Sequence, residues 1–308
     1  MTPFLKLYLR ESPGPIQVAV FGKHPAWDDH IDDIGLTTQT LVYTKRILYS
    51  EGIATQLASG AWDQIERSGH ALEFNHRFVW GRGNRSVLGG LWASTDGKGR
   101  ARFPIAICFQ SDVDTLQALA LYWAPLESLG QQCRAATTRD IVLDLVRQTS
   151  IYLNSPDFPK FAPLNTLFSS SCDPFSDVTV QSLEYLAGHW NNNRKPSTHF
   201  RLPPVCDSSQ ESIGFWSGFA DRHVSGVPTL TISAIGREPV DLIVGEPSPD
   251  DLFVLRARQS VADFTAAVPL TASTHAKNDA RNYLQSFRLG PGAASKQRPW
   301  LSRVFGKR

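Results

Sequence analysis

Residues Trp80–Gln110 read WGRGNRSVLGGLWASTDGKGRARFPIAICFQ and carry the clearest structural pattern in the chain. Two apolar runs, Ser86–Ala93 and Phe103–Phe109, flank a turn that is rich in glycine and charge. Each run is too short for a typical helix and is bounded by Gly or Pro, so both are predicted to be strands. Just before them, Leu72–Trp80 alternates apolar and polar residues with a period of two, which predicts a half-buried strand. We therefore expect a three-stranded antiparallel meander over residues 71–110.

Helical and strand patterns continue on both sides of this meander. Ile16–Gly22 (IQVAVFG) predicts a first strand, and apolar residues between Leu36 and Leu57 share one face of a helix. Three further helices are predicted, at residues 114–123, 138–153 and 182–190. Later strand candidates are Ile213–Ser217, Thr229–Ile235 and Leu242–Val244.

Local signals predict where several helices begin or end. Pro125 is expected to interrupt the helix that precedes it, because proline lacks the backbone N–H of the helical ladder. Thr137 and Asp140 form a weak version of a capping box. A helix is expected to start near Pro249, with Ser248 or Asp250 as its cap.

The order of these elements predicts the fold class. Strands cluster before residue 110 and again after residue 210, with helices between them, and there is no strict strand–helix alternation. This arrangement favours an α+β fold with a mostly antiparallel sheet flanked by helices. We expect one domain over residues 16–268, with a linker-like break at Asn191–Pro196 (NNNRKP). Residues 269–308 are expected to form a basic, loosely ordered C-terminal tail.

Composition limits the classes of function. The 308 residues are 42% apolar, enough for a substantial core, and the net charge of +2 gives no global field for nucleic acid or a membrane. No apolar run of the length of a membrane span, about 18 residues, occurs, so no transmembrane helix is expected. The N-terminal stretch does not resemble a signal peptide, and a cytoplasmic location is the default expectation.

Cysteine spacing and the basic tail add two expectations. The four cysteines contain no CxxC pair, so neither a zinc cluster nor a disulfide scaffold is expected; they are Cys108, Cys133, Cys172 and Cys206. The last 32 residues hold eight basic side chains and one acidic one. Within them, Arg298–Arg308 is a short basic amphipathic piece, which is either a frayed tail or a segment that docks on a protein groove or an anionic surface.

The densest cluster of candidate chemical groups lies between His24 and Asp33. Histidine with nearby carboxylates suits a transition metal or acid–base work, which leaves a metal-dependent hydrolase as an alternative function. The spacing matches neither a zincin helix nor an EF-hand loop, and the other interpretation is a loop that leads into a helix. Elsewhere, Gly81–Ser86 lacks the phosphate-loop pattern, and Ser217 does not lie in GxSxG. No catalytic residue, metal or cofactor is therefore predicted.

Three ordered motifs resemble TagF-type accessory proteins of type VI secretion. The first is Phe21–Ala26 (FGKHPA), which is similar to the opening Gly-Lys-x-Pro of that family. The second combines Asp96 with the run Gly99–Pro104 (GRARFP), which leads into an apolar strand. The third is Gly214–Gly218 (GFWSG), which is followed by the apolar run Pro228–Ile235. Together the motifs extend over residues 16–260.

The resemblance to TagF implies a cytoplasmic, non-enzymatic regulator of type VI secretion or a related contractile assembly. Such proteins act after translation, are linked to a forkhead-associated scaffold protein, and work beside a threonine kinase and phosphatase pathway. The expected partners are therefore secretion-system scaffold or assembly proteins, and not nucleic acid.

The loop after the first strand is the predicted recognition element. It joins a strand to a helix at a sheet edge, where loops often carry function. Its four aspartates repel one another, and a basic partner surface would relieve that repulsion. With the motif residues added, the predicted partner-binding set is Gly22, Lys23, Pro25, Asp28, Asp29, Arg100 and Trp216.

Overall fold

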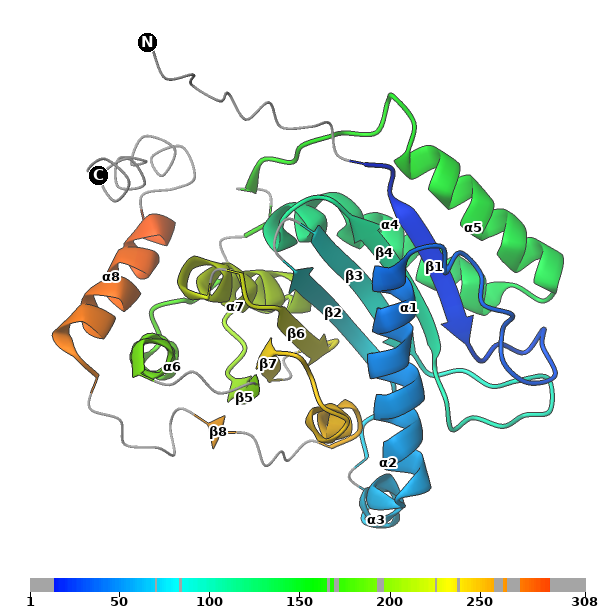
Figure 1. The fold of residues 1–308 in the computed structure, drawn as a ribbon, viewed down its shortest axis with the longest axis horizontal. Helices are drawn as coiled ribbons and strands as arrows, with labels where there is room; N and C mark the ends of the chain where they lie inside the picture. The colour runs from blue at the N-terminus through cyan, green and yellow to red at the C-terminus, as the bar shows by residue number, and fades with distance from the viewer. Residues whose placement is uncertain are drawn as a thin grey trace, which may run out of the picture.

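A computed structural model describes residues 14–288 except 70, 83–84, 165–166, 169–171, 193–196, 225, 237–238, 258–262 and 265–271. Its centre is one sheet in the order β1-β4-β3-β2-β6-β7-β5-β8 (Figure 1). The strands are β1 (Gln17–Gly22), β2 (Asn75–Arg82), β3 (Arg85–Trp92), β4 (Ile105–Ser111), β5 (Ser197–Leu202), β6 (Thr229–Ala234), β7 (Val240–Gly245) and β8 (Asp263–Phe264).

Seven of these strands run antiparallel to their neighbours, and only the two-residue β8 pairs in parallel, with β5. The predicted meander is confirmed, because β2 pairs with β3 and β3 pairs with β4, with Phe78 opposite Gly89 and Leu88 opposite Phe109. The strands after residue 210 complete the same sheet through the pairing of β2 with β6. No pattern in the sequence indicated β5.

Helices cover both faces of the sheet and so produce two separate cores. One core is formed with α4 (Thr115–Ala135), α5 (Arg139–Leu153), α6 (Asp177–Asn192), α7 (Ser209–His223) and α8 (Thr274–Arg288). The other core is formed with α1 (Gln39–Lys45), the π-helical η1 (Arg46–Ile53), α2 (Ala54–Ala58), α3 (Ala61–Arg67) and the 3₁₀ helix η3 (Asp250–Leu255). The predicted α+β class is confirmed. In Figure 1, α5 lies beside β1 at one side of the molecule, and α8 lies beside α6 at the other.

Burial of both faces corrects the prediction of a half-buried second strand. Phe78 and Trp80 lie in one core and Val79 lies in the other. Arg77 is also buried, because its guanidinium pairs with Glu127 of α4. A period of two in the sequence therefore marks which core a residue faces, and not which side of the strand meets water.

Pro125 does not end the helix that contains it. The helix α4 continues to Ala135, with Leu126 and Leu129 fully buried beyond the proline. Packing of these residues offsets the missing N–H bond at Pro125, so burial overrides the local signal. At α5 the capping residue is Thr138 and not Thr137, since Thr138 Oγ1 accepts a hydrogen bond from the Ile141 N–H at 3.4 Å.

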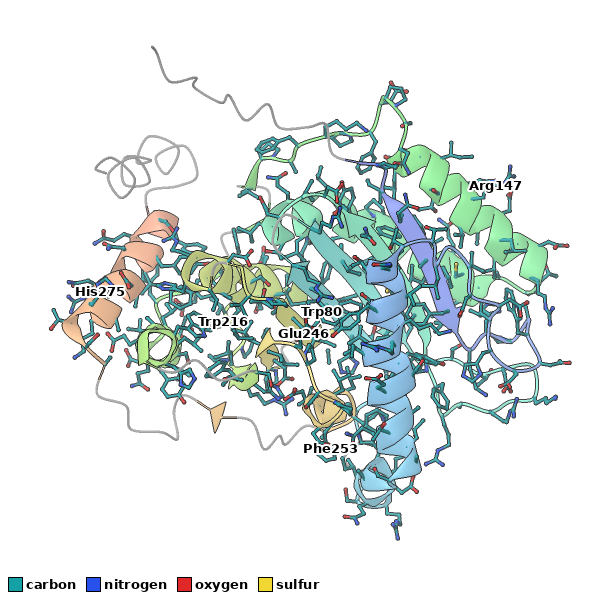
Figure 2. The ribbon with its side chains drawn as sticks, viewed as in Figure 1. Trp80, Arg147, Trp216, Glu246, Phe253 and His275 are labelled. Atoms are coloured by element: carbon teal, nitrogen blue, oxygen red, sulfur yellow. A yellow bond between two sulfur atoms is a disulfide. The ribbon has the colours of Figure 1, made fainter. Side chains whose placement is uncertain are left out.

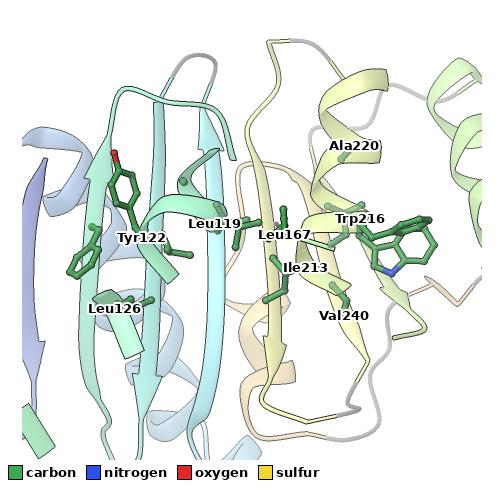
Figure 3. Close-up of a cluster of buried hydrophobic side chains, with 14 of the residues drawn as sticks. Leu119, Tyr122, Leu126, Leu167, Ile213, Trp216, Ala220 and Val240 are labelled. Carbon is green, nitrogen blue, oxygen red and sulfur yellow. The ribbon is translucent and has the colours of Figure 1, made fainter. Parts of the chain in front are cut away.

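The predicted strand Ile213–Ser217 is wrong, because these residues belong to α7. The helix is buried on most of its sides. Its Trp216 and Phe219 are fully buried, and a Cβ atom at Gly214 would lie 3.1 Å from the Leu167 side chain. A helix that is buried on most sides shows no amphipathic period, so its sequence resembles a buried strand. Figure 3 shows Ile213, Trp216 and Ala220 in this cluster together with Leu119 and Leu126.

The predicted loose tail is wrong for residues 274–288, which form α8. Ala276, Ala280 and Leu284 are buried, and the Tyr283 hydroxyl donates a 2.6 Å hydrogen bond to the Phe215 carbonyl of α7. The amphipathic piece Arg298–Arg308 lies outside the described residues, as does most of the predicted break at Asn191–Pro196.

The indole of Trp92 lies between the sheet and α4, and it leaves no room for a side chain at Gly90 or at Gly130. A Cβ atom at Gly90 or at Gly130 would lie 2.4 Å from Trp92 ring atoms. The Arg77 guanidinium carbon also lies 4.2 Å from the centroid of this ring. The close approach of α4 to β3 therefore requires glycine at both positions.

We predict that Gly130→Ala destabilises the protein by about 1–3 kcal/mol, because the added methyl group overpacks the Trp92 site. Helix propensity alone would favour alanine there by ~1 kcal/mol. Urea unfolding measures the difference, and the matched control is the same change in a Trp92→Phe background, where the smaller ring leaves room. An equal cost in both backgrounds would contradict the steric explanation.

Candidate functional site

The first two sequence motifs meet at one end of the sheet. The strands β1 and β4 are antiparallel neighbours, so the loop that leaves β1 and the loop that enters β4 lie at the same end. The Lys23 N–H donates to the Pro104 carbonyl at 3.0 Å, and the Gly97 N–H donates to the Trp27 carbonyl at 2.7 Å. We call residues 23–34 and 93–104 together the two-loop surface.

A buried carboxylate joins the two loops. The Asp96 side chain is fully buried and accepts hydrogen bonds from Lys23 Nζ and from Arg100 Nε, the latter at 2.6 Å. The backbone N–H groups of Lys98 and Arg100 donate to its other oxygen, each at 3.0 Å. Burial raises the pKa of Asp96, but the hydrogen bonds from Lys23 and Arg100 outweigh that effect and hold the pKa well below its usual range.

Gly22 and Lys23 support this arrangement from inside the fold. Gly22 has φ = 100°, and a Cβ atom there would lie 2.2 Å from the Pro104 carbonyl oxygen, so only glycine fits. This turn directs Lys23 inward, where the residue is 4% exposed. Neither residue presents a surface to a partner, whereas Pro25 is exposed.

Two aspartates of the first loop form ion pairs with lysine and arginine side chains of the same chain. Asp29 lies 3.5 Å from Lys23 Nζ and 3.1 Å from Arg100 Nη2, and its side chain stays 66% exposed. Asp33 accepts from Lys45 Nζ at 2.6 Å. The predicted repulsion within this loop is therefore largely compensated inside the molecule. The Asp28 side chain has no polar partner among the described residues, although its carbonyl accepts from Arg100 at 2.9 Å.

His24 is not placed as a metal ligand or a base. Its ring is fully buried, Nε2 donates to the Cys133 carbonyl at 2.8 Å, and Nδ1 accepts from the Ala26 N–H at 3.1 Å. Burial lowers the pKa of His24, partly opposed by the Cys133 hydrogen bond, so the ring is neutral. Asp32 instead accepts from the Trp27 indole N–H at 3.2 Å. Among the described residues, no group of convergent metal-ligand atoms includes this loop.

Three rings from separate segments lie beside the ion pairs. The centroid of His30 is 5.2 Å from that of Phe103 and 5.8 Å from that of Tyr49 in η1. Phe103 and Tyr49 lie 5.3 Å apart. Burial raises the pKa of Tyr49 well above its usual range, so its hydroxyl stays neutral. Sequence reasoning missed Tyr49 as part of this site, because η1 is distant in the chain and its register is decided by packing.

Trp216 lies apart from the two-loop surface. It is fully buried in α7, and its indole N–H donates to the Pro203 carbonyl at 2.9 Å. Figure 2 shows Trp216 within the fold, whereas Arg147 on α5 points outward. The third sequence motif therefore contributes to the core and does not join the first two.

The two-loop surface combines a fixed backbone with exposed charges of both signs. The side chains of Asp29 and Arg100 are 66% and 52% exposed. Each also contacts one residue of the buried pair, Asp29 contacting Lys23 and Arg100 contacting Asp96. Nothing in this arrangement resembles an activated nucleophile. Such a surface is suited to recognition of another macromolecule through complementary charge.

No helix within the described ranges is long and apolar enough to cross a membrane.

Comparison with known proteins identifies no relative by sequence: no protein family and no curated protein matches the chain. Among solved structures, the chain is similar to the crystal structure of PA0076 from Pseudomonas aeruginosa PAO1, at 16% sequence identity and a TM-score of 0.42. The match covers 83% of this chain and 99% of that chain. A likeness of this strength carries no conclusion about function.

We predict that Asp96→Asn strongly destabilises the protein at pH 7, because Lys23 then loses its buried anion and keeps only the exposed Asp29 carboxylate, 3.5 Å away. The low pKa of Asp96 means that its ionised form stabilises the fold above the unfolded pKa of about 3.9 and loses that effect as pH falls further. The difference from the unchanged protein should therefore shrink below about pH 4.

Urea unfolding between pH 3 and pH 7 measures both parts of this prediction. Asp144→Asn on α5 is the control, since the Asp144 side chain is 44% exposed and pairs with Arg147 at the surface, where changes stay within about 0.5 kcal/mol. Equal effects of the two substitutions, or a difference that does not depend on pH, would contradict the role given to Asp96.

Proposed function

We propose that this protein is a non-enzymatic accessory or regulatory protein of a type VI secretion or related contractile injection system, acting after translation through protein–protein contacts. The observation that carries the proposal is the joining of two TagF-like motifs, Phe21–Ala26 and Asp96–Pro104, in the two-loop surface. These segments are separated by about 70 residues in the sequence, and the Lys23–Asp96 pair links them directly.

The distribution of charge supports binding over catalysis. Buried groups of the site, Lys23 and Asp96, satisfy each other, which makes the surface rigid. Exposed charged groups of both signs lie on this surface: Asp28, Asp29, Asp32 and Asp33 on one loop, and Lys98, Arg100 and Arg102 on the other. Asp29 and Arg100 lie 3.1 Å apart. A partner with complementary charge would associate quickly and in a defined orientation, which suits a regulator that responds to the state of an assembly.

No specific observation favours a metal-dependent hydrolase. His24 uses both ring nitrogens within the fold, and the loop carboxylates Asp29, Asp32 and Asp33 each contact a different set of protein groups. We therefore do not propose that activity.

Affinity purification of the full chain from the cell that encodes it tests the proposed function. Components of a secretion baseplate, sheath or forkhead-associated scaffold should be recovered, and each should bind the purified protein directly. Recovery of none of them, together with no direct binding to purified components, would contradict the proposal.

We predict that Asp28→Ala weakens binding to such a partner about fivefold, or ~1 kcal/mol, and leaves the melting temperature unchanged. Asp28 is the clean position, because its carboxylate supports no described contact, whereas Asp29 contacts Lys23 and Arg100. The matched control is Asp157→Ala, because Asp157 is also an exposed aspartate but follows α5, outside the two-loop surface. It lies three residues after Asn154, whose side chain exchanges hydrogen bonds with the Ile16 backbone just before β1. Unchanged affinity for Asp28→Ala in calorimetric titration would remove the two-loop surface as the binding site.

A further inference from the structure

A disulfide joins two segments that the sequence places 34 residues apart. Cys172 lies shortly before α6, and Cys206 lies shortly before α7. Cys206 is 5% exposed, whereas Cys172 is half-buried and therefore accessible to small molecules. The expectation that the cysteines form no disulfide-rich scaffold does not exclude one such bond, and spacing alone did not indicate this pair.

Hydrogen bonds next to the disulfide also connect the segment before α6 to the segment before α7, and the latter to α7 itself. The Asp173 N–H donates to the Val205 carbonyl at 3.0 Å. On the other side, Ser212 Oγ in the first turn of α7 accepts from the N–H groups of Val205 and Cys206 at 3.2 and 3.1 Å. The backbone at Cys206 is therefore anchored to α7 whether or not the sulfur atoms are bonded. The bond to Cys172 adds the segment before α6 to this anchor.

The long connection between α5 and α6 has its other attachments further from α6. Phe158 stacks on Tyr122 of α4 with ring centroids 5.8 Å apart. Gln117 of α4 exchanges two hydrogen bonds with the Ala162 backbone, at 3.0 and 3.1 Å. Leu167 is buried against Gly214 of α7. Phe168 also lies beside Gly214, and its ring packs on Phe287 of α8 with centroids 5.2 Å apart. Closer to α6, the disulfide and the backbone bond from Asp173 attach this connection to the segment before α7.

The other two cysteines differ from this pair. Cys108 in β4 and Cys133 in α4 are fully buried and are not bonded. Burial raises the pKa of Cys133 to about 12, and the pKa of Cys108 also lies well above its usual range. Because the thiolate is the reactive form, both are inert in the folded protein and serve as internal standards for labelling.

We propose that Cys172 and Cys206 form a reversible redox site, which ties the start of α6 to the start of α7 when oxidised and releases it when reduced. In the oxidising direction, the Cys172 thiolate attacks one sulfur of a small disulfide such as oxidised glutathione and displaces one glutathione thiolate. The Cys206 thiolate then attacks the Cys172 sulfur and displaces the second. Two protein thiols are oxidised, one disulfide is reduced to two thiols, and these take up the two protons. The inference stands independently of the proposed secretion function.

Labelling of the full chain in denaturant with iodoacetamide tests the bond. Protein purified without reductant, or treated with oxidised glutathione, should show two labelled thiols by mass spectrometry, Cys108 and Cys133. Treatment of the native protein with dithiothreitol before denaturation should give four, and subsequent oxidised glutathione should restore two. Four labelled thiols after oxidised glutathione would overturn the proposal, and this is also the result if the pair holds a metal ion as free thiolates.

A second experiment tests the tie between α6 and α7. Reduction should lower the melting temperature by about 5 °C, since the loop that the bond closes is freed in the unfolded chain. Chymotrypsin should also cleave between Phe161 and Phe175 several-fold faster after reduction. Cys172→Ser should match the reduced protein and should not change further with dithiothreitol. Equal cleavage rates and melting temperatures with and without the bond would show that the disulfide does not hold the start of α6 to α7.

Discussion

A charge in the protein interior needs a partner, and the carboxylate of Asp96 shows how much structure that requirement organises. Removal of an ionised group from water is costly unless opposite charge and hydrogen bonds compensate for it. Asp96 receives Lys23 from one loop and Arg100 with two backbone N–H groups from the other. This pairing connects the end of β1 to the start of β4, and it depends on Gly22, whose positive φ turns Lys23 inward. The two-loop surface is thus positioned by an interaction that is not itself exposed.

The sheet supplies the frame for that surface because helices cover both of its faces. Alternate residues of one strand enter different cores, as Phe78 and Val79 do, so a slip of one residue in register would move each side chain into the core that is packed for its neighbours. Glycines provide the remaining fit. Gly89 leaves room for the Phe78 ring, and Gly130 lets α4 approach Trp92. Loops at the end of such a frame can hold exposed side chains in fixed positions, which favours recognition.

The two sites depend on different chemistry and lie on different segments. The two-loop surface offers fixed charges around Asp96, and the Cys172–Cys206 pair offers a covalent link that a change in redox conditions can open. In the proposed regulator, the first would recognise a component of the assembly. The second would change how firmly the start of α6 is held to α7. The remaining cysteines, Cys108 and Cys133, are unreactive in the folded protein because burial raises the pKa of their thiols.

The sequence by itself determined the α+β class, the meander of β2, β3 and β4, and the location of the candidate loop, because short-range periodicity and turn residues carry that information. It failed where tertiary packing outweighs local preference. Pro125 is retained inside α4 by buried neighbours, and Ile213–Ser217 is helical because α7 is surrounded on most sides. It also could not tell which of the seven predicted binding residues face solvent. Whether Lys23 is exposed or paired with Asp96 is decided by contacts between segments 73 residues apart, and pairing over such distances in the chain arises only when the sheet brings its strand ends together.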